Sequence, residues 1–473
     1  MVAAVPSDFA LLSLCELTAA LREKRLSAVE LMRATLDRVD ATRERLNAVP
    51  VTADRSDLLE QAHAADARLS SGQARPLEGV PLGVKDLEDA RGLATSHGSL
   101  PYRDRVAELD STQVARLKHA GAIVVGKTNA PEFGHTAITR NLVYGVTRSP
   151  WNAERTPGGS SGGSAAALTG GVLPLVTASD GGGSIRIPGS FVGAFGLKTT
   201  YGRIPGGPLH RWSHIMTAVQ GPLTKTVADA ALFLDQVVGH DATDPSSLPH
   251  PGISYSSVLA SALPKRLRIA FSPDFGHVPV QADIASVVEE AARTFEKLGH
   301  ELVALPGGPP DLTAAWGLMN ALEVGGLMQE FRPAREKDFT QSLLGVVRMA
   351  EAMTGPFWND VALKRAELVR WCAELFADYD LLVTPTVPFD PPPAKGPFPQ
   401  EIEGRTMPTA SVAAFCIPFN MSWHPAATVR AGMSRAGLPI GLQIVAPLQR
   451  EDLLLQIAYA YERERPWHPD WPR

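Results

Sequence analysis

Apolar residues recur at helical spacing along the first seventy residues of the chain. Leucines and valines between residues 9 and 43 return every three or four positions, which predicts amphipathic helices. Ser27 precedes the second half of this stripe and Glu30 follows three residues later, the spacing of a capping box. Residues 58–69 continue the pattern up to a Ser-Ser-Gly sequence. We therefore expect an N-terminal helical region over residues 1–75.

Short apolar runs interrupt the helical pattern farther along the chain. They have the length and the apolar or β-branched content of buried strands. The runs lie at residues 79–84, 122–125, 267–271, 381–384 and 440–445. Helical patterns at 112–120 and 284–298 alternate with them, and proline-rich residues 388–399 predict an extended surface excursion. Alternating strands and helices predict an α/β fold, here one large α/β/α sandwich around a mixed, largely parallel sheet.

Composition and charge exclude several classes of protein. The net charge is only −5 and no Lys/Arg-rich run occurs, so no nucleic-acid partner is expected. The three cysteines lie far apart, which predicts reduced thiols and no disulfide framework. No signal-peptide pattern and no apolar run of about 20 residues is found, so no membrane segment is expected. We expect a cytoplasmic protein without a metal or a cofactor.

Two local motifs suggest functions that their surroundings contradict. Residues 121–128 match the phosphate-binding pattern Gly-x4-Gly-Lys-Thr, but a predicted helix precedes them and the intervening residues themselves resemble a strand. Residues 158–162 match Gly-x-Ser-x-Gly, yet polar residues 152–157 stand where a nucleophile elbow needs an apolar strand. We reject a nucleotide site and an α/β-hydrolase elbow.

Two serines lie in clusters that are unusually rich in glycine. Ser160 follows Gly158 and Gly159, and Ser184 follows three consecutive glycines in an otherwise apolar region. Glycine permits unusual backbone geometry, so consecutive N–H groups before Ser184 could point at one spot, as stabilising an oxyanion requires. A plain loop is the alternative interpretation.

Lys85 is the best candidate for a base. It follows an apolar strand, where burial would lower its pKa from about 10.4 so that a neutral amine could accept a proton near pH 7. From the residues alone, a solvated lysine at a strand end remains the alternative.

Four segments taken together resemble the amidase-signature family: residues 79–86, 126–133, 157–164 and 180–188. The similarity continues through residues 221–223, 227–230, 384–386 and 437–443, and so covers nearly the whole chain. The resemblance implies one domain over residues 1–473. Its parts would be the helical region 1–75, a signature core 79–205, substrate-region helices 206–380, and C-terminal strands and a helix 381–473.

The resemblance also implies a Ser–cis-Ser–Lys triad. Ser184 would be the nucleophile, Ser160 the bridging serine after a cis peptide bond, and Lys85 the base. Ser161 is the neighbouring candidate, but the family's spacing to the nucleophile selects Ser160. The backbone N–H groups of Gly181, Gly182, Gly183 and Ser184 would form the oxyanion hole.

Aromatic and methionine residues in the segments outside the signature core predict an apolar substrate pocket. Each of them alone is compatible with an ordinary core position. Residues expected to bind substrate are Gly134, Tyr144, Gly159, Trp212, Met216, Trp316, Trp358 and Phe415. We expect a monomer or homodimer that acts on small hydrophobic or aryl amides, with esters and carbamates (urethanes) as further candidates.

Two other functions remain open at this point. The family includes the glutamine-hydrolysing subunit of tRNA-dependent amidotransferases, which needs an acidic group for the amine of a free amino acid. Residues 410–415, ahead of Asn420, contain no carboxylate, which favours a stand-alone amidase. A catalytically dead binding protein is disfavoured because Lys85, Ser160 and Ser184 are all retained.

Overall fold

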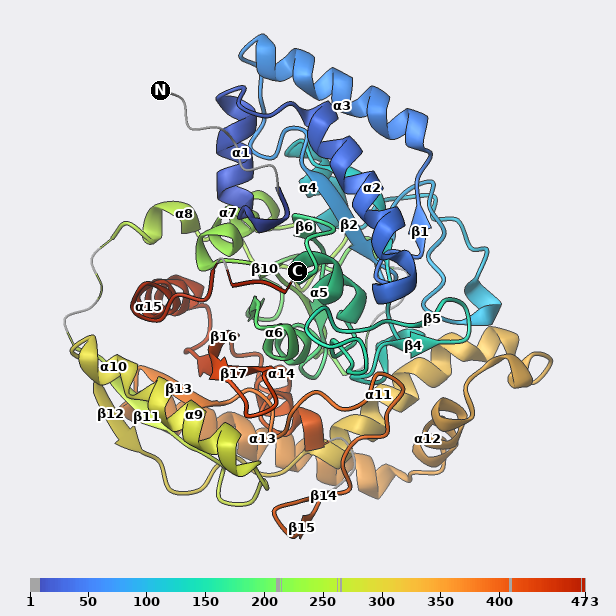
Figure 1. Cartoon of the computed structure of the whole chain (residues 1–473). Coiled ribbons are helices and arrows are strands. Elements are labelled where there is room, and N and C mark those ends of the chain that lie inside the picture. Colours follow the sequence, from blue (N-terminus) through green and yellow to red (C-terminus); the bar gives the residue numbers. More distant parts are fainter. Residues whose placement is uncertain are drawn as a thin grey trace.

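The N-terminal helices form where the leucine pattern predicts them. In this computed structural model, which describes residues 9–209, 213, 215–261, 263, 266–407, 411–468 and 470–472, the stripe is divided between α1 (Leu14–Arg22) and α2 (Ala28–Leu46). The predicted capping box at the start of α2 is confirmed: Ser27 Oγ accepts from Glu30 N–H, and the Glu30 carboxylate accepts from Ser27 N–H. α3 (Arg55–Ser70) follows and packs beside α2 (Figure 1).

The strands within the described residues form two main sheets at the centre of the molecule. The four-stranded sheet has the order β1 (Val51–Thr52), β3 (Ile123–Thr128), β2 (Pro81–Lys85), β6 (Leu175–Val176). The seven-stranded sheet has the order β10 (Leu223–Thr224), β8 (Phe195–Lys198), β16 (Ala426–Met433), β17 (Pro439–Val445), β13 (Leu381–Pro385), β11 (Arg268–Phe271), β12 (Glu301–Ala304). Edge strands β6 and β10 contact each other, so the two sheets adjoin.

The predicted α/β fold with a mixed sheet is confirmed. Strand β2 is parallel to β3 and β6, and β11 is parallel to β12 and β13. Antiparallel pairing is more extensive than a largely parallel sheet would have, because β16 and β17 form a hairpin and also pair antiparallel with β8 and β13. A hairpin needs only a short connection, whereas parallel neighbours need a crossover.

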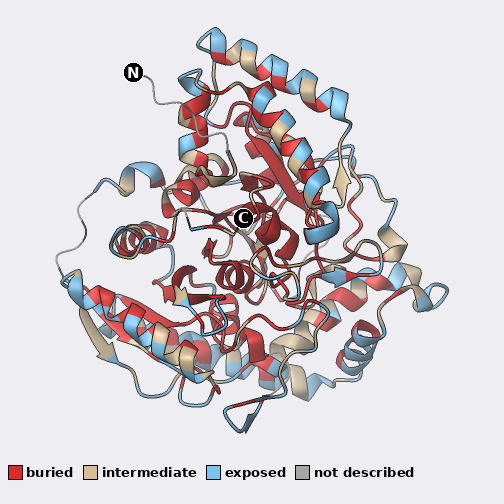
Figure 2. Cartoon of the chain, viewed as in Figure 1, coloured by how far each residue is buried: buried red, intermediate tan, exposed pale blue. Residues whose placement is uncertain are grey.

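Two central helices are completely buried (Figure 2). They are α5 (Gly162–Thr169) and α6 (Arg186–Val192), which follow the two glycine-serine clusters. α5 consists of small or apolar residues on all sides, which is the pattern of a core helix. These helices hold the two serine clusters inside the molecule.

The remaining helices surround this centre. A hairpin of α11 (Thr313–Met328) and α12 (Gln341–Glu351) leads into the long α13 (Gly355–Asp378). The predicted helix at 284–298 is divided into α9 (Ala282–Ala292) and α10 (Thr294–Lys297). The others are α4 (Thr112–His119), α7 (Val227–Val237), α8 (Tyr255–Val258), α14 (Ile417–Met421) and α15 (Glu451–Glu464). Short strands are β4 (Arg140–Asn141), β5 (Gly145–Val146), β7 (Ser179–Asp180), β9 (Val219–Gln220), β14 (Glu401–Ile402) and β15 (Arg405–Thr406).

The Gly-Lys-Thr sequence that imitates a phosphate-binding loop lies inside strand β3. Gly126 is needed there because a Cβ would lie 2.0 Å from Val51 O in the neighbouring strand β1. Lys127 is buried and its Nζ donates hydrogen bonds to Thr95 Oγ1, at 3.0 Å, and to Glu88 O. The segment therefore has a structural role, consistent with rejecting a nucleotide site.

The proline-rich segment 388–399 is only partly the surface excursion that we predicted. Phe389 is 3% exposed and packs in a hydrophobic cluster with Ile187 and Ile417. The backbone carbonyls of Pro391 and Pro392 accept hydrogen bonds from Arg155 and from Thr156 N–H. Contacts with residues more than 200 positions earlier in the chain bury the first half of the segment.

Across the ranges that the structure describes, we find no helix with the length and apolar content needed to cross a lipid bilayer.

The close packing of α5 against β3 and the loop that follows it gives a test of the fold. A Cβ at Gly163 would lie 2.2 Å from Asn129 N and 2.4 Å from Asn129 O, and backbone atoms cannot yield as a side chain can. We expect Gly163→Ala to lower the free energy of unfolding by about 1–3 kcal/mol, because it overpacks the core. Thermal unfolding of the purified variant measures this.

The matched control is Gly345→Ala in α12, where no described atom lies within 4 Å of the added Cβ. It should raise stability by roughly 0.5–1 kcal/mol, since alanine replaces glycine inside a helix. Unfolding midpoints that do not separate in this order would contradict the packing described for α5.

Candidate active site

The amine of Lys85 lies at the centre of a cluster of serine side chains. Lys85 ends strand β2 and is 1% exposed. Its Nζ hydrogen-bonds with Ser160 Oγ and Ser161 Oγ, both at 2.8 Å, and with Ser179 Oγ at 2.9 Å and Ser179 O at 3.2 Å. Its backbone N–H donates to Thr177 Oγ1 at 2.9 Å, which fixes the end of the strand.

This environment favours an uncharged amine. Burial lowers the pKa of Lys85 to about 7, although the charges of Asp180 and Glu88 act in the opposite direction. Among the described residues, every Nζ partner is a hydroxyl or a carbonyl rather than a carboxylate, so none of them forms a direct ion pair with the ammonium form. A neutral amine has a lone pair and can accept a proton from a serine hydroxyl.

Two neighbouring serines lie equally close to Lys85, but their other contacts differ. Ser161 Oγ donates to Ser179 O at 3.2 Å and accepts from Ser179 N–H at 3.4 Å. Ser160 Oγ has Lys85 as its hydrogen-bond partner and no second one in the described part of the chain. Ser160 follows a cis peptide bond after Gly159. Ser160 is therefore better placed than Ser161 to pass a proton onward.

Ser184 lies beside these serines, between β7 and α6. Its carbonyl accepts a hydrogen bond from Ser161 N–H at 3.3 Å, which holds the two serine segments side by side. The Ser184 side chain is partly exposed, and within the described ranges its hydroxyl forms no hydrogen bond, with Ser160 or any other residue. Catalytic hydrogen bonds are often long before substrate binds and shorten in the complex. The structure thus forms the Lys85–Ser160 link and leaves the Ser160–Ser184 link open.

The glycine loop before Ser184 offers fewer free N–H groups than the sequence suggested. Gly183 N–H donates to Asp180 Oδ1 at 2.6 Å, so this group is engaged inside the protein. The N–H groups of Gly181, Gly182 and Ser184 have no partner among the residues that the structure places. Of the four N–H groups predicted to form the oxyanion hole, that of Gly183 is therefore already bound to the buried carboxylate of Asp180.

A buried ion pair, Asp180 with Arg186, holds the glycine loop before Ser184 in place. Arg186 and Asp180 are both inaccessible to solvent, and Arg186 Nη2 lies 3.0 Å from Asp180 Oδ1. Burial alone would raise the pKa of Asp180, but the charge and hydrogen bonds of Arg186 outweigh it and hold that pKa well below its usual range. Arg186 also donates to Gln443 Oε1 at 2.7 Å, and Asn420 Nδ2 donates to Asp180 Oδ1 at 2.9 Å.

Sequence reasoning missed this supporting network. Asp180 and Arg186 lie in a segment that carried the family resemblance, and their opposite charges close to Ser184 were the available signal. Asn420 and Gln443 are more than 230 residues away in sequence, so only the fold reveals their role.

Several of the residues expected to bind substrate do lie near the serines. A Cβ at Gly134 would come within 3.1 Å of Ser160 Oγ, and Gly159 immediately precedes Ser160. Trp316 donates from Nε1 to Gly181 O at 2.9 Å. Met216 is half-buried and lies two residues before Ala218, whose Cβ would be 3.7 Å from a Cβ added at Gly181.

Others do not. Phe415 is inaccessible and its ring lies 5.0 Å from that of Phe275, so it belongs to the core and not to a pocket wall; this prediction was wrong. The ring of Trp358 packs on Phe357 at 5.0 Å. Burial raises the pKa of Tyr144, which lies close to Asp86 and Ser96. Trp212 falls outside the described residues.

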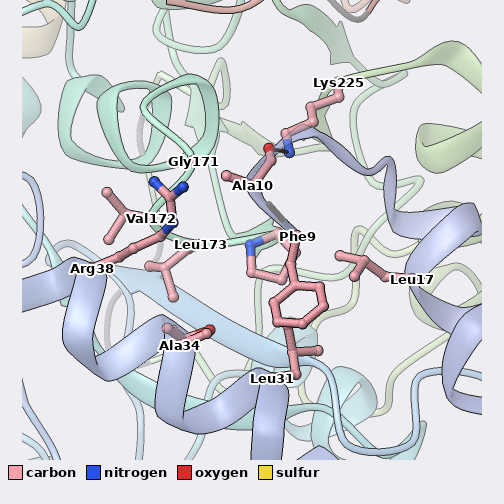
Figure 3. Close-up of a pocket in the computed structure, with 12 residues that line it drawn as sticks. Phe9, Ala10, Leu17, Leu31, Ala34, Arg38, Gly171, Val172, Leu173 and Lys225 are labelled. Atoms are coloured by element: carbon pink, nitrogen blue, oxygen red, sulfur yellow. Dashed lines mark hydrogen bonds between the residues drawn. The ribbon is translucent and has the colours of Figure 1, made fainter. Parts of the chain in front are cut away.

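A small cavity of 60 Å³ lies away from these residues (Figure 3). It is lined by N-terminal residues such as Phe9, Leu17 and Arg38 together with Leu173 and Lys225, and it includes none of the three predicted catalytic residues. Within the described ranges, no three His, Cys, Asp or Glu side chains group as metal ligands. The hydrogen-bonded serines and Lys85, rather than this cavity, define the candidate site.

Comparison with known proteins gives the family. A family model described as Amidase matches residues 30–455. The chain belongs to the amidase family. It is 34% identical over 471 residues to an acylamidase from Rhodococcus erythropolis, covering 96% of each protein. It is also 33% identical over 482 residues to a glutamyl-tRNA(Gln) amidotransferase subunit from Geobacter sp. (strain M21), covering 97% of this chain and 98% of that one.

The fold agrees with this assignment. The crystal structure of a bacterial aryl acylamidase of the amidase-signature family superposes with a TM-score of 0.91 at 28% identity, over 98% of both chains. The predicted family is confirmed, and so is the enzyme class, a hydrolase of carbon–nitrogen bonds other than peptide bonds.

The pKa of Lys85 predicts how the activity of this amidase depends on pH. If Lys85 is the base, it must be neutral, and kcat/KM should rise as the pH increases through about 7 and level off above it. A pH profile of amide hydrolysis measures this.

A second buried amine provides the control. Burial, with help from the charge of Arg186, lowers the pKa of Lys198 to about 7 as well. Its Nζ donates to Thr199 O at 2.7 Å and, in the described part of the chain, hydrogen-bonds to none of the serines around Lys85. Lys198→Met should keep the same pH limb. If the rise in kcat/KM near pH 7 disappears in this variant, the group that titrates is Lys198 and not Lys85.

Proposed function

We propose that this amidase acts on its own and hydrolyses hydrophobic or aryl carboxamides through an acyl-enzyme on Ser184. The observation that supports it most is the contact of a buried amine, with a pKa of about 7, with the hydroxyl of Ser160 at 2.8 Å. Ser184 lies next to this pair, before a fully buried helix and after a glycine loop.

The proposed reaction is a two-step acyl transfer. Neutral Lys85 takes the proton of Ser160, Ser160 takes that of Ser184, and Ser184 Oγ attacks the substrate carbonyl. This requires the open Ser160–Ser184 contact to shorten when substrate binds. The relay then returns a proton to the leaving nitrogen, and water hydrolyses the acyl-enzyme.

The negative charge that develops on the carbonyl oxygen needs donors that are already in place. The unpartnered N–H groups of Gly181, Gly182 and Ser184 are the candidates within the described residues. Asp180 and Arg186 hold the loop that presents them through buried contacts, so the donors need little reorganisation during the reaction.

The choice of hydrophobic and aryl substrates rests on the apolar residues beside the loop and on the relatives. The indole of Trp316 borders the glycine loop through its hydrogen bond to Gly181 O and its ring against Gly182. The relatives named acylamidase and aryl acylamidase match nearly the whole chain. Esters and carbamates would follow the same acyl-transfer chemistry, so we include them as candidate substrates.

The amidotransferase relative supports a second candidate function, hydrolysis of glutamine within a tRNA-dependent amidotransferase. Against it, Ser411, Val412, Ala413 and Phe415 are buried and the segment offers no carboxylate for the amine of glutamine. Release of ammonia from glutamine, compared with release of aniline from acetanilide, separates the two candidates. Turnover of glutamine alone would favour the amidotransferase function.

Replacing the nucleophile is the direct test of the mechanism. We expect Ser184→Ala to reduce hydrolysis of acetanilide to background and to abolish labelling by a fluorophosphonate probe, because it removes the hydroxyl that forms the acyl-enzyme in this mechanism. Mass spectrometry of the labelled wild-type protein should place the adduct on Ser184. Near-normal turnover by Ser184→Ala would remove the proposal.

The bridging role of Ser160 can be separated from simple contact with Lys85. Ser160→Ala should lower kcat/KM by about 10²–10⁴-fold, the usual contribution of a proton-transfer group. Ser161→Ala removes a hydroxyl at the same 2.8 Å from Lys85, but one that is already bound to Ser179, and should cost less than about tenfold. The reverse order of effects would make Ser161 the bridge.

A further inference from the structure

Trp316 contacts the glycine loop from a helix that contributes none of the proposed catalytic groups. Its indole Nε1 donates a hydrogen bond to Gly181 O at 2.9 Å. Its ring lies against Gly182, where a Cβ would come within 2.4–2.7 Å of three ring atoms. Gly182 must therefore be a glycine for the ring to occupy this place.

This hydrogen bond determines the direction of the Gly181–Gly182 peptide. The Gly181–Gly182 peptide bond is not among the cis peptides of the described chain, so the C=O of Gly181 and the N–H of Gly182 point to opposite sides. Holding Gly181 O on Trp316 thus directs the Gly182 N–H away from the indole. Without such a contact, a peptide between two glycines can rotate more easily than any other.

The other end of the loop is held independently. Asp180 Oδ1 accepts from Gly183 N–H at 2.6 Å. Gly182 N–H lies between these two fixed points and has no partner in the part of the chain that is described. The loop is therefore fixed on both sides of one free donor.

Helix α11, which supplies Trp316, packs against the same hydrophobic cluster as the helix that follows Ser184. Trp316 N–H donates to Leu312 O at 2.8 Å in the first turn of α11. Leu312, 1% exposed, belongs to the same hydrophobic cluster as Ile187 of α6 and Cys416, and Trp316 packs against this cluster. α6 begins two residues after Ser184. The indole and the nucleophile are thus positioned by one common core.

We propose that Trp316 is a positioning residue for the oxyanion hole. By holding Gly181 O, it keeps the Gly182 N–H oriented toward the oxygen of the tetrahedral intermediate. This rests on the proposed function, because it requires the intermediate to form on Ser184. It assigns Trp316 a role in the rate of the chemical step, beyond lining a pocket.

Trp316→Phe tests the role of the hydrogen bond, since it keeps an aromatic ring on Gly182 and removes the N–H donor. Loss of one oxyanion donor costs about 10²–10³-fold in kcat, and a donor that is only misoriented should cost about 10–100-fold. We expect kcat for acetanilide to fall by this factor with KM changed less than about threefold. The matched control is Trp467→Phe, which removes an indole donor to the carbonyl of Lys225, also at 2.9 Å, within the main hydrophobic core; it should leave both constants unchanged.

Inhibition by 2,2,2-trifluoroacetophenone distinguishes positioning from pocket lining. This ketone forms a tetrahedral adduct with a nucleophilic serine and places an oxyanion in the hole. Its inhibition constant should rise in Trp316→Phe by the same factor by which kcat/KM falls. If only KM for aryl substrates rises while kcat and this inhibition constant stay unchanged, Trp316 is a pocket wall and the proposal is overturned.

A second variant breaks the same contact from the loop side. Gly182→Ala must displace the ring and should reduce kcat to a similar extent. In a Trp316→Ala background the same substitution should have little further effect, because contacting residues are not additive in a double-mutant cycle. Additive losses would overturn the proposal even if one variant also loses stability. If instead Ser184→Ala retains activity, the proposed function fails; if only Trp316→Phe is without effect, this inference alone fails.

Discussion

The buried contact between Asp180 and Arg186 is the constraint on which the geometry of the site depends. Removing two charges from water is costly, and the pair is tolerated only where further hydrogen bonds satisfy its remaining atoms. Asp180 meets this requirement by accepting from the N–H groups of Gly183 and Ile185, and Arg186 by donating to Gln443 and the carbonyl of Cys416. The same bonds fix the backbone on both sides of Ser184. A pair that stabilised only itself would leave Ser184, the proposed nucleophile, free to move.

The cost of burying a charge also explains why Lys85, unlike Arg186, has a lowered pKa. Its amine is as deeply buried as Arg186, but it has hydroxyls and a carbonyl instead of a carboxylate as direct partners. The charges of Asp180 and Glu88 then offset desolvation only in part, and the neutral form becomes accessible near neutral pH. One buried cation stays charged and organises the loop, while the other is close to neutrality, as the proposed proton relay requires. The two functions require different neighbours within one small volume.

The helices α11 and α12 connect the part of the chain outside the signature core to this centre. Thr340 at the start of α12 donates to the buried carboxylate of Glu132 from its N–H, at 3.0 Å, and from its hydroxyl, at 2.7 Å. Tyr102 OH donates to Leu327 O at 2.9 Å. With Trp316 on the glycine loop, these contacts fix the hairpin to the segments that hold Ser160 and Ser184. A change in the hairpin can therefore reach the glycine loop before Ser184.

The sequence by itself determined what depends on near neighbours: the capped helix at Ser27, the apolar strand that ends at Lys85, and the glycine runs before Ser160 and Ser184. The order of these segments was enough to predict the family, since such motifs are long and specific. Tertiary structure decided which groups are free to act. It engages Gly183 N–H with Asp180, places Phe415 in the core and Trp316 on the loop, and sets Ser161 as close to Lys85 as Ser160. These outcomes depend on burial and on partners that are distant in the chain or fixed by loop geometry, and neither spacing nor composition records such contacts.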